Sequence, residues 1–187
     1  MKILHVINNL DAGGAQKLVA DLAMLQDDLE DTEVEIATIL PEGEALFGKW
    51  LASHSSIKIH HFSFRKPFSP ASVTKLRNLF RDFDLIHAHL FPSVYLCALA
   101  ITGISKPMVY TEHSTSNRRR DHKILLPVEK MVYARYDAIA CISEATKENL
   151  LKWLDNSRIS KRTVVIHNGV DNRKYELGTP FPVSEIF

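Results

Sequence analysis

The chain has 187 residues, a length that fits one domain of ordinary size. It is 45% hydrophobic and 24% charged, as ordinary soluble globular proteins are. With 23 Lys and Arg residues against 22 Asp and Glu residues the formal net charge is +1, so no global field favours nucleic acid as a partner.

No targeting or membrane-spanning segment is predicted. Met1 and Lys2 run directly into a strand-like segment, which is not how a signal peptide begins. No run approaches the roughly 18 apolar residues of a spanning helix. Cys97 and Cys141 are too few for a disulfide scaffold and lie in apolar contexts typical of buried thiols in a reducing compartment. We therefore expect a cytoplasmic protein.

Short β-rich segments alternate with helical segments along the chain. The strands are expected at residues 2–8, 34–40, 57–62, 84–89, 107–112, 137–143 and 163–168. Apolar residues recur at helical spacing between most of them, as in Leu18, Leu22, Leu25 and Leu29. The pattern predicts an α/β fold, a Rossmann-like doubly wound parallel sheet of about seven strands with helices on both faces. The expected strand order is 3-2-1-4-5-6-7.

The composition changes near residue 168. From there Gly, Asn, Asp and Pro accumulate and the periodicity fails. We therefore predict a Rossmann-like domain over residues 1–167, and over residues 168–187 an interdomain linker with the start of a second domain.

Two adjacent glycines, Gly13 and Gly14, stand between the first expected strand and the first expected helix. Glycine lets the backbone approach a ligand closely, and a helix N-terminus presents free N–H groups and a partial positive charge. The pair therefore indicates a phosphate site, and the competing interpretation is a tight turn that needs φ above zero. The dinucleotide fingerprint and the Walker lysine motif are absent, which argues against NAD and P-loop nucleotides.

Histidines gather where the middle strands end. His87 and His89 end the fourth expected strand and His113 ends the fifth, at the edge where doubly wound sheets bind ligands. One interpretation is a metal site, although no carboxylate or cysteine completes an obvious ligand set. A second, favoured for His87, is a structural ring satisfied by backbone. In the third, His89 and His113 hydrogen-bond a polar ligand. A packing role is expected for the other strand histidines, His5, His60 and His61.

Two loops carry basic residues. Residues 116–123 (SNRRRDHK) form either a solvated face or a surface that attracts anionic lipid head groups or a lipid-linked diphosphate. Residues 62–70 (FSFRKPFSP) form either a mobile loop beside the cleft or a packed connection. The lipid interpretation adds a peripheral contact with the cytoplasmic face of a membrane.

Five motifs follow one another in a specific order: Gly-Gly after the first strand, HAH after the fourth, EHS after the fifth, CISEATKENL, and VIHNGVD near the end. Together they resemble the N-terminal half of a GT-B glycosyltransferase of family 4, the retaining group that builds capsules, lipopolysaccharides and glycolipids. The resemblance covers about residues 2–175. VIHNGVD followed by KY is similar to the family pattern VxxNGVDxxxF, which leads from the acceptor domain to the donor domain.

The resemblance implies an enzyme that moves a sugar from a nucleotide-sugar donor to a glycan or lipid-linked acceptor with retention. It places Gly13 and Gly14 against the donor diphosphate and gives His113 the catalytic position, through hydrogen bonds to the transferred sugar or the acceptor. Acceptor or sugar contacts are expected from His89, Glu112, Ser114 and Arg118. Hinge residues are expected at Asn168, Gly169 and Asp171. No metal, no other cofactor and no dedicated protein base is expected.

Family members are usually about twice this length, and their second domain grips the sugar nucleotide through elements such as Glu-x7-Glu, which this sequence lacks. The 187-residue chain is therefore expected to transfer no sugar by itself. The alternative is a non-catalytic acceptor-binding subunit of a split glycosyltransferase that recruits a separate donor-binding protein. A more distant alternative is a nucleotide-binding or cofactor-binding Rossmann domain unrelated to sugars.

Overall fold

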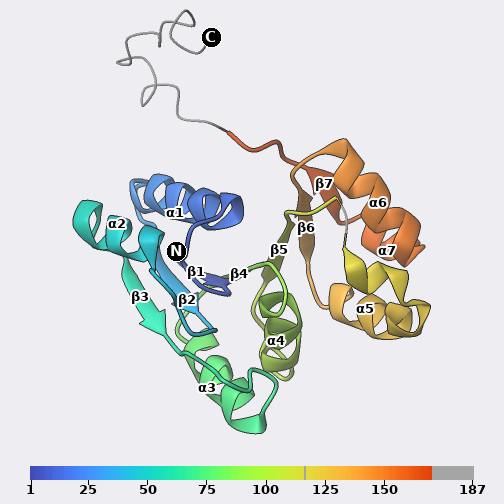
Figure 1. The fold of residues 1–187 in the computed structure, drawn as a ribbon, viewed down its shortest axis with the longest axis horizontal. Coiled ribbons are helices and arrows are strands. Elements are labelled where there is room, and N and C mark those ends of the chain that lie inside the picture. The colour runs from blue at the N-terminus through green and yellow to red at the C-terminus, as the bar shows by residue number, and fades with distance from the viewer. Residues whose placement is uncertain (116, 170–187) are drawn as a thin grey trace, which may run out of the picture.

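The computed structural model describes residues 1–115 and 117–169, and within them a parallel sheet of seven strands forms the centre (Figure 1). The strands are β1 Lys2–Ile7, β2 Glu33–Thr38, β3 Lys58–His61, β4 Leu85–His89, β5 Met108–Glu112, β6 Ala138–Cys141 and β7 Thr163–Val165. Their order across the sheet is β3-β2-β1-β4-β5-β6-β7, and each neighbouring pair is parallel. The predicted strand order is confirmed.

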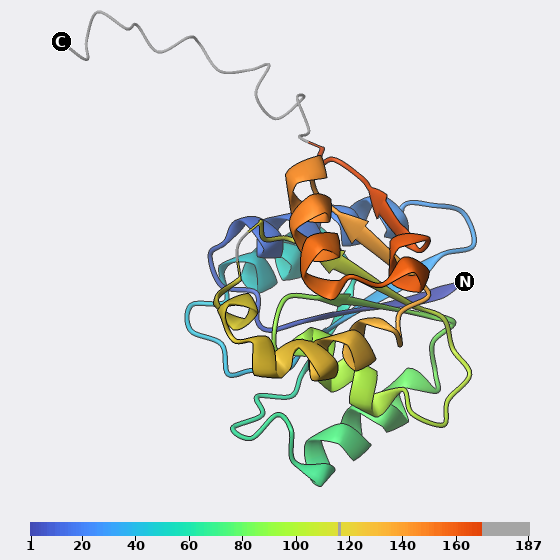
Figure 2. The ribbon, with the colours of Figure 1, turned by 90° about the vertical axis from the view of Figure 1, so that its right-hand side faces the viewer.

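Helices lie on both faces of the sheet, as predicted (Figures 1 and 2). They are α1 Gly14–Asp27, α2 Leu46–His54, α3 Pro70–Phe80, α4 Ser93–Ala100, α5 Leu126–Tyr133, α6 Glu144–Leu154 and α7 Ser157–Ser160, with two short 3-10 helices, η1 Arg118–Asp121 and η2 Lys123–Leu125. On one face α1 packs beside α2. On the other face α3, α4, α5 and α6 pack in series, each against the next.

The chain winds outward from β1 to β3 and then crosses to β4 on the other side of β1. This reversal places β1 beside β4, and in doubly wound sheets such a switch point is where ligands bind, outside the carboxyl ends of the strands. Functional groups at the ends of β1, β4 and β5 therefore meet at one edge of the sheet.

Alternate residues of the strands fill two separate apolar layers. Ile3 on β1 packs with Val19 of α1, whereas its neighbour Leu4 packs with Phe80 of α3 on the opposite face. The layer below α3–α6 is the larger one and includes the buried thiols of Cys97 and Cys141, as predicted. Among the described residues, no helix combines the length and the apolar character needed to cross a membrane.

A hollow of about 710 Å³ lies beside α1, on the face of the sheet that α1 covers. Its walls include Leu22 and Leu25 of α1, Thr111 of β5 and Ala140 of β6. Leu25 and Leu29 are each 59% exposed, and Leu29 lies beyond the end of α1. The helical spacing of these leucines therefore identified α1 correctly but did not give the face that the sheet covers.

Candidate functional site

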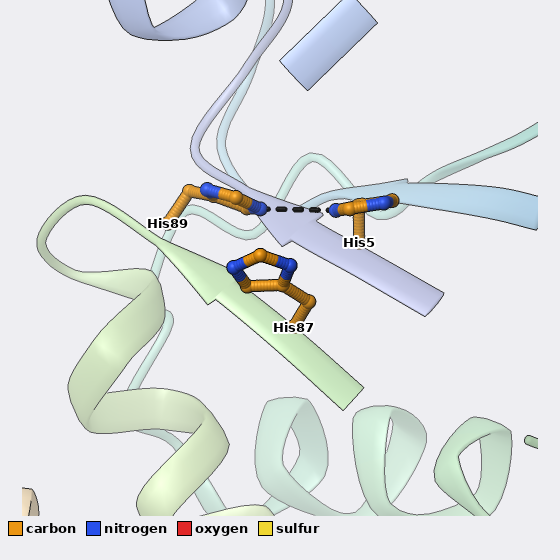
Figure 3. Close-up of side chains that lie close together, drawn as sticks. All are labelled: His5, His87 and His89. Carbon is orange, nitrogen blue, oxygen red and sulfur yellow. Dashed lines mark hydrogen bonds between the residues drawn. The ribbon is translucent and has the colours of Figure 1, made fainter. Parts of the chain in front are cut away.

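Four histidines lie close together near the ends of β1, β4 and β5. His5 pairs across the sheet with His87, and His87 shares a face with His89 because the two are two residues apart on a strand. His113 follows β5, whose Thr111 pairs with His89. Figure 3 shows His5 reaching from β1 toward the two histidines of β4.

Hydrogen bonds join three of these rings in series. The Nδ1 atom of His5 lies 3.0 Å from Nε2 of His89, and Nδ1 of His89 lies 3.1 Å from Nε2 of His113. At the other end, Nε2 of His5 lies 2.7 Å from Oε1 of Gln26 on α1. We call the series Gln26–His5–His89–His113 the histidine chain.

Burial keeps the rings of the histidine chain neutral. His5 and His89 have no exposed surface. Burial lowers the pKa of His5 to about 4, although the hydrogen bond to Gln26 acts in the opposite direction. Burial also lowers the pKa of His113 to about 4. The pKa of His89 is held well below its usual range by burial and then by the neighbouring imidazoles. Each ring therefore carries one N–H and one bare nitrogen at neutral pH.

The same region meets the simplest requirement for a metal site. One ring nitrogen each from His5, His87 and His89 lies within 4.8 Å of the others, and imidazole suits zinc, copper, iron and nickel. However, His5 and His89 already face each other with their nitrogens, and Nε2 of His87 lies 2.8 Å from Oγ1 of Thr111. Within the described residues no carboxylate or cysteine joins the group. These contacts favour hydrogen bonding over coordination.

The structure contradicts the prediction that His89 binds a polar ligand directly. Its ring is fully buried, and both nitrogens are used, one by His5 and one by His113. His113 differs because it is partly exposed, and its Nδ1 has no hydrogen-bond partner among residues 1–115 and 117–169. Within the histidine chain, His113 therefore lies at the end that can reach a ligand at the carboxyl edge of the sheet.

Glu112 lies immediately before His113 but is not available to a ligand. It is 3% exposed, and its Oε2 accepts hydrogen bonds from Nη2 of Arg120 at 2.6 Å and from the hydroxyl of Tyr133 at 3.0 Å. The Arg120 side chain is itself only 7% exposed. The predicted contact of Glu112 with the sugar or acceptor is therefore wrong, since this carboxylate anchors the segment after β5.

Arg119, the residue before Arg120, forms a second ion pair. The Nε atom of Arg119 lies 3.1 Å from Oε1 of the buried Glu129 on α5, and its guanidinium lies 4.3 Å from the ring centroid of Phe91. Arg119 and Arg120 are therefore neither a solvated face nor free to attract lipid. Arg118 is exposed, and its contact with the acceptor stays a prediction.

The glycine pair opens α1. Gly13 precedes the helix with an extended φ of 170°, and Gly14 is the first helical residue. Extended backbone of this kind is open to any residue, and among the described residues Gly103, with φ of 80°, is the one glycine in the left-handed region, so the tight-turn interpretation is wrong. A Cβ atom on Gly14 would meet nothing within 4 Å. Gly13 supplies no side-chain cap to the first turn of α1, so the N–H groups of that turn lack the side-chain acceptor that an anion could replace.

The remaining predictions have mixed outcomes. Ser114 is partly exposed and donates its N–H to Oε1 of Glu112 at 3.4 Å, so its contact with a sugar stays a prediction. Asn168 and Gly169 are exposed beside the hollow, and their hinge role also stays a prediction. Asp171 lies outside the described residues.

Packing and capping settle two further points. Ser143, directly before α6, caps that helix by accepting a hydrogen bond from the N–H of Thr146. Phe62 and Phe64 stack with centroids 4.9 Å apart, and Phe64 is buried, which makes the start of the 62–70 segment a packed connection.

The sequence interpretation missed the roles of His5 and Gln26. His5 was assigned to packing, and Gln26 was not considered. The predicted strand order could have pointed to His5, because it makes β1 and β4 neighbours and so places His5 near His87 and His89. No comparable signal identifies Gln26, whose position depends on how α1 lies across the sheet.

The doubly wound parallel sheet of this chain matches the fold of the N-terminal half of GT-B proteins. The fold matches an Anabaena protein, HepE, solved with UDP and glucose, with a TM-score of 0.77 and 23% identity over 100% of this chain and 49% of that one. A glycosyltransferase from Rickettsia africae matches with a TM-score of 0.66 and 15% identity, over 96% and 46%. A UDP-GlcNAc 2-epimerase from Neisseria meningitidis bound to UDP-GlcNAc matches with a TM-score of 0.61 and 15% identity, over 90% of this chain and 46% of that one.

The chain belongs to Glycosyltransferase Family 4, whose sequence model matches residues 12–174. Comparison with curated protein sequences gives no match. The chain spans about half the length of the solved structures that it matches. At these identities the structural likeness establishes the fold, and the epimerase demonstrates that this fold also occurs in proteins that are not named as transferases.

Proposed function

We propose that this chain is the N-terminal, acceptor-binding half of a retaining glycosyltransferase that moves a sugar from a nucleotide-sugar donor to a glycan or lipid-linked acceptor. The observation that carries the proposal is the family match over residues 12–174, which includes the glycine pair, His89 and His113. The UDP and UDP-sugar ligands of structurally similar proteins support a nucleotide-sugar donor. Cell-surface polysaccharide or glycolipid synthesis in the cytoplasm is the proposed setting.

The proposed roles follow from the positions of the side chains. The uncapped first turn of α1, at Gly13 and Gly14, would stabilise the charge that grows on the donor phosphate as it departs. His113 would position the transferred sugar or the acceptor through a hydrogen bond. The departing phosphate itself takes the proton of the acceptor hydroxyl in this proposal, so no protein group acts as the base and no metal is required.

The experiment compares the complete protein with the 187-residue chain. The complete protein is incubated with a panel of nucleotide sugars and with candidate glycan and lipid-linked acceptors, and the anomeric configuration of the product is determined by NMR. We expect transfer with retention by the complete protein and none by the 187-residue chain. Calorimetry on the chain should give an affinity for nucleotide sugars weaker than micromolar, because the half that grips the donor is not included.

The role of His113 is tested in the same assay. Replacing His113 with Ala removes a hydrogen bond and should cost about 1–3 kcal/mol in kcat/KM if the partner group is left unpaired. Replacing the exposed His61 of β3 with Ala is the matched control and should leave kcat/KM unchanged. Normal kcat/KM in His113→Ala would make His113 a structural residue. Transfer that starts only after a separate donor-binding protein is added to the 187-residue chain would identify the split enzyme instead.

A further inference from the structure

The histidine chain connects two different surfaces of the molecule. Gln26 lies on the wall of the hollow beside α1, whereas His113 lies at the carboxyl edge of β5. Between them, His5 and His89 are fully buried and have heavy-atom separations of 2.7 to 3.1 Å along the series. These distances are those of ordinary hydrogen bonds, so each ring is coupled to the next.

A neutral imidazole has one N–H donor and one bare acceptor nitrogen. In a series of such rings each N–H must face a bare nitrogen, because two facing donors or two facing acceptors would leave buried polar groups unsatisfied. Only two arrangements satisfy this condition. Either every histidine donates toward Gln26, or every histidine donates toward His113 and beyond.

The orientation of the Gln26 amide, which turns its oxygen toward His5, selects between the two arrangements. Its Oε1, which is an acceptor, faces Nε2 of His5, so Nε2 of His5 carries the proton. The bare Nδ1 of His5 then accepts from Nε2–H of His89. In the same way, the bare Nδ1 of His89 accepts from Nε2–H of His113. The other nitrogen of His113, Nδ1, is left without a proton.

We propose that Gln26, His5 and His89 are positioning residues that hold His113 as its Nε2–H tautomer, with a bare Nδ1 that accepts a hydrogen bond from a substrate hydroxyl group. The source of that hydroxyl, the transferred sugar or the acceptor, rests on the proposed function. The tautomer of His113 does not rest on the proposed function, because it follows from the hydrogen bonds within the histidine chain.

The arrangement gives His113 a defined polarity that a solvent-exposed histidine lacks. The alternative tautomer would direct an N–H instead of a lone pair at the hydroxyl, and the hydroxyl would have to turn its proton elsewhere. Because the pKa values of His5 and His113 are near 4, protonation at neutral pH does not disturb the arrangement. His87 packs against His89 with ring centroids 4.1 Å apart but does not belong to the series, since its Nε2 is beside Thr111.

The experiment measures the tautomers directly. The 187-residue chain is labelled with ¹⁵N in its histidines, and long-range ¹H–¹⁵N spectra at pH 7 distinguish protonated from bare ring nitrogens. We expect His5, His89 and His113 all to be neutral Nε2–H tautomers. A wild-type His113 that is protonated at Nδ1, or at both nitrogens, would overturn the proposal, whatever any variant does.

Gln26→Met tests whether the amide sets the polarity. Methionine matches glutamine in length but lacks the carbonyl acceptor, and position 26 borders the hollow instead of the core. The variant should lose the single Nε2–H state of His113, with changes at His5 and His89 together. The matched control is Gln16→Met, the same change on the same helix, where the amide contacts Asn9 instead. An unchanged His113 in Gln26→Met would refute the positioning role.

A titration with Zn²⁺ is the third part of the experiment. If adding Zn²⁺ removed the N–H signals of His5 and His89 and shifted those of His87 with them, the three rings would form a metal site and the proposal would be wrong. We expect no such change.

Activity of the complete protein is measured last. Gln26→Met should lower kcat by about fivefold, the effect of weakening about one hydrogen bond, with KM for the donor unchanged. An unchanged kcat would remove the functional part of the proposal. The predicted tautomers in a complete protein that transfers no sugar would instead contradict the proposed function alone.

Discussion

On the two sides of the segment after β5, titratable side chains are buried and satisfied in different ways. On the α1 side, the histidine chain buries titratable rings in neutral form and satisfies them through one directional series of hydrogen bonds. On the α5 side, Glu112 and Arg120 form a buried ion pair, completed by Tyr133. Burial thus selects neutrality where only imidazoles meet, and charge pairing where a carboxylate meets a guanidinium.

The comparison shows how His113 is held. Its ring belongs to the neutral series, while its backbone neighbour Glu112 belongs to the ion pair. The ion pair fixes the position of the segment, and the neutral series fixes which nitrogen carries the proton. The changes Glu112→Gln and His5→Asn each act on one side only and so separate the two contributions.

The largest effect on stability is expected from Glu112→Gln. The change leaves the guanidinium of Arg120 buried without its carboxylate, which costs about 3–5 kcal/mol in the free energy of unfolding, measured by urea denaturation. The matched control is Glu33→Gln, which breaks the exposed pair with Lys2 at 2.8 Å and should cost far less, because solvent screens that pair. Equal losses in the two variants would mean that burial does not strengthen the Glu112–Arg120 pair.

The next effect is a pH dependence that belongs to the histidine side. The pKa of His5 is lowered from 6.5 to about 4, so between these values the unfolded chain binds more protons than the folded one. Stability is therefore complete above pH 6.5 and falls as the pH drops toward 4, by about 1.4 kcal/mol per pH unit for each such histidine.

Comparison with a variant isolates this contribution from that of the carboxylates. In His5→Asn the loss of stability between pH 6.5 and pH 4 should be smaller than in the wild type by about 3 kcal/mol, as followed by urea denaturation at each pH. Identical slopes for the two proteins would show that His5 is not held neutral by burial.

A smaller effect on stability is expected at the glycine pair, which lies outside both regions. Gly14→Val should change the free energy of unfolding by no more than about 1 kcal/mol, because its side chain would enter open space and glycine is already a poor helix former. In the complete protein the same change should raise KM for the donor by crowding the phosphate, with Gly14→Ala intermediate. Normal kcat/KM for the donor in Gly14→Val would argue against a phosphate at this helix terminus.

The smallest effect is expected from Arg118→Ala, at the exposed end of the basic segment. Its loss should change stability by no more than about 0.5 kcal/mol. If the segment contacts a membrane, the affinity of the complete protein for vesicles with anionic lipid should fall by about 1 kcal/mol, and the difference should vanish at high salt. Equal vesicle binding by variant and wild type would contradict the proposed role of Arg118 at a membrane.

The sequence by itself determined the architecture of this protein. Alternating apolar strands and amphipathic helices predict a parallel sheet, and the right-handed crossover rule then restricts the strand order. The period of two along β4 places His87 and His89 on one face, and the glycine pair falls at the first helix terminus. Periodicity and chain connectivity are local or topological properties, so a single sequence expresses them.

Only the tertiary structure decided which polar groups are free to act. Arg118 and Arg120 are two residues apart, but Arg118 is exposed, while Arg120 reaches inward to Glu112 because α5 closes over that segment. His89 and His113 appeared equivalent as strand-end histidines, yet His89 is buried against His5, which comes from a distant part of the chain, whereas His113 stays partly exposed at the edge. Burial depends on which distant elements pack over a residue, and composition, spacing and period carry no record of that packing.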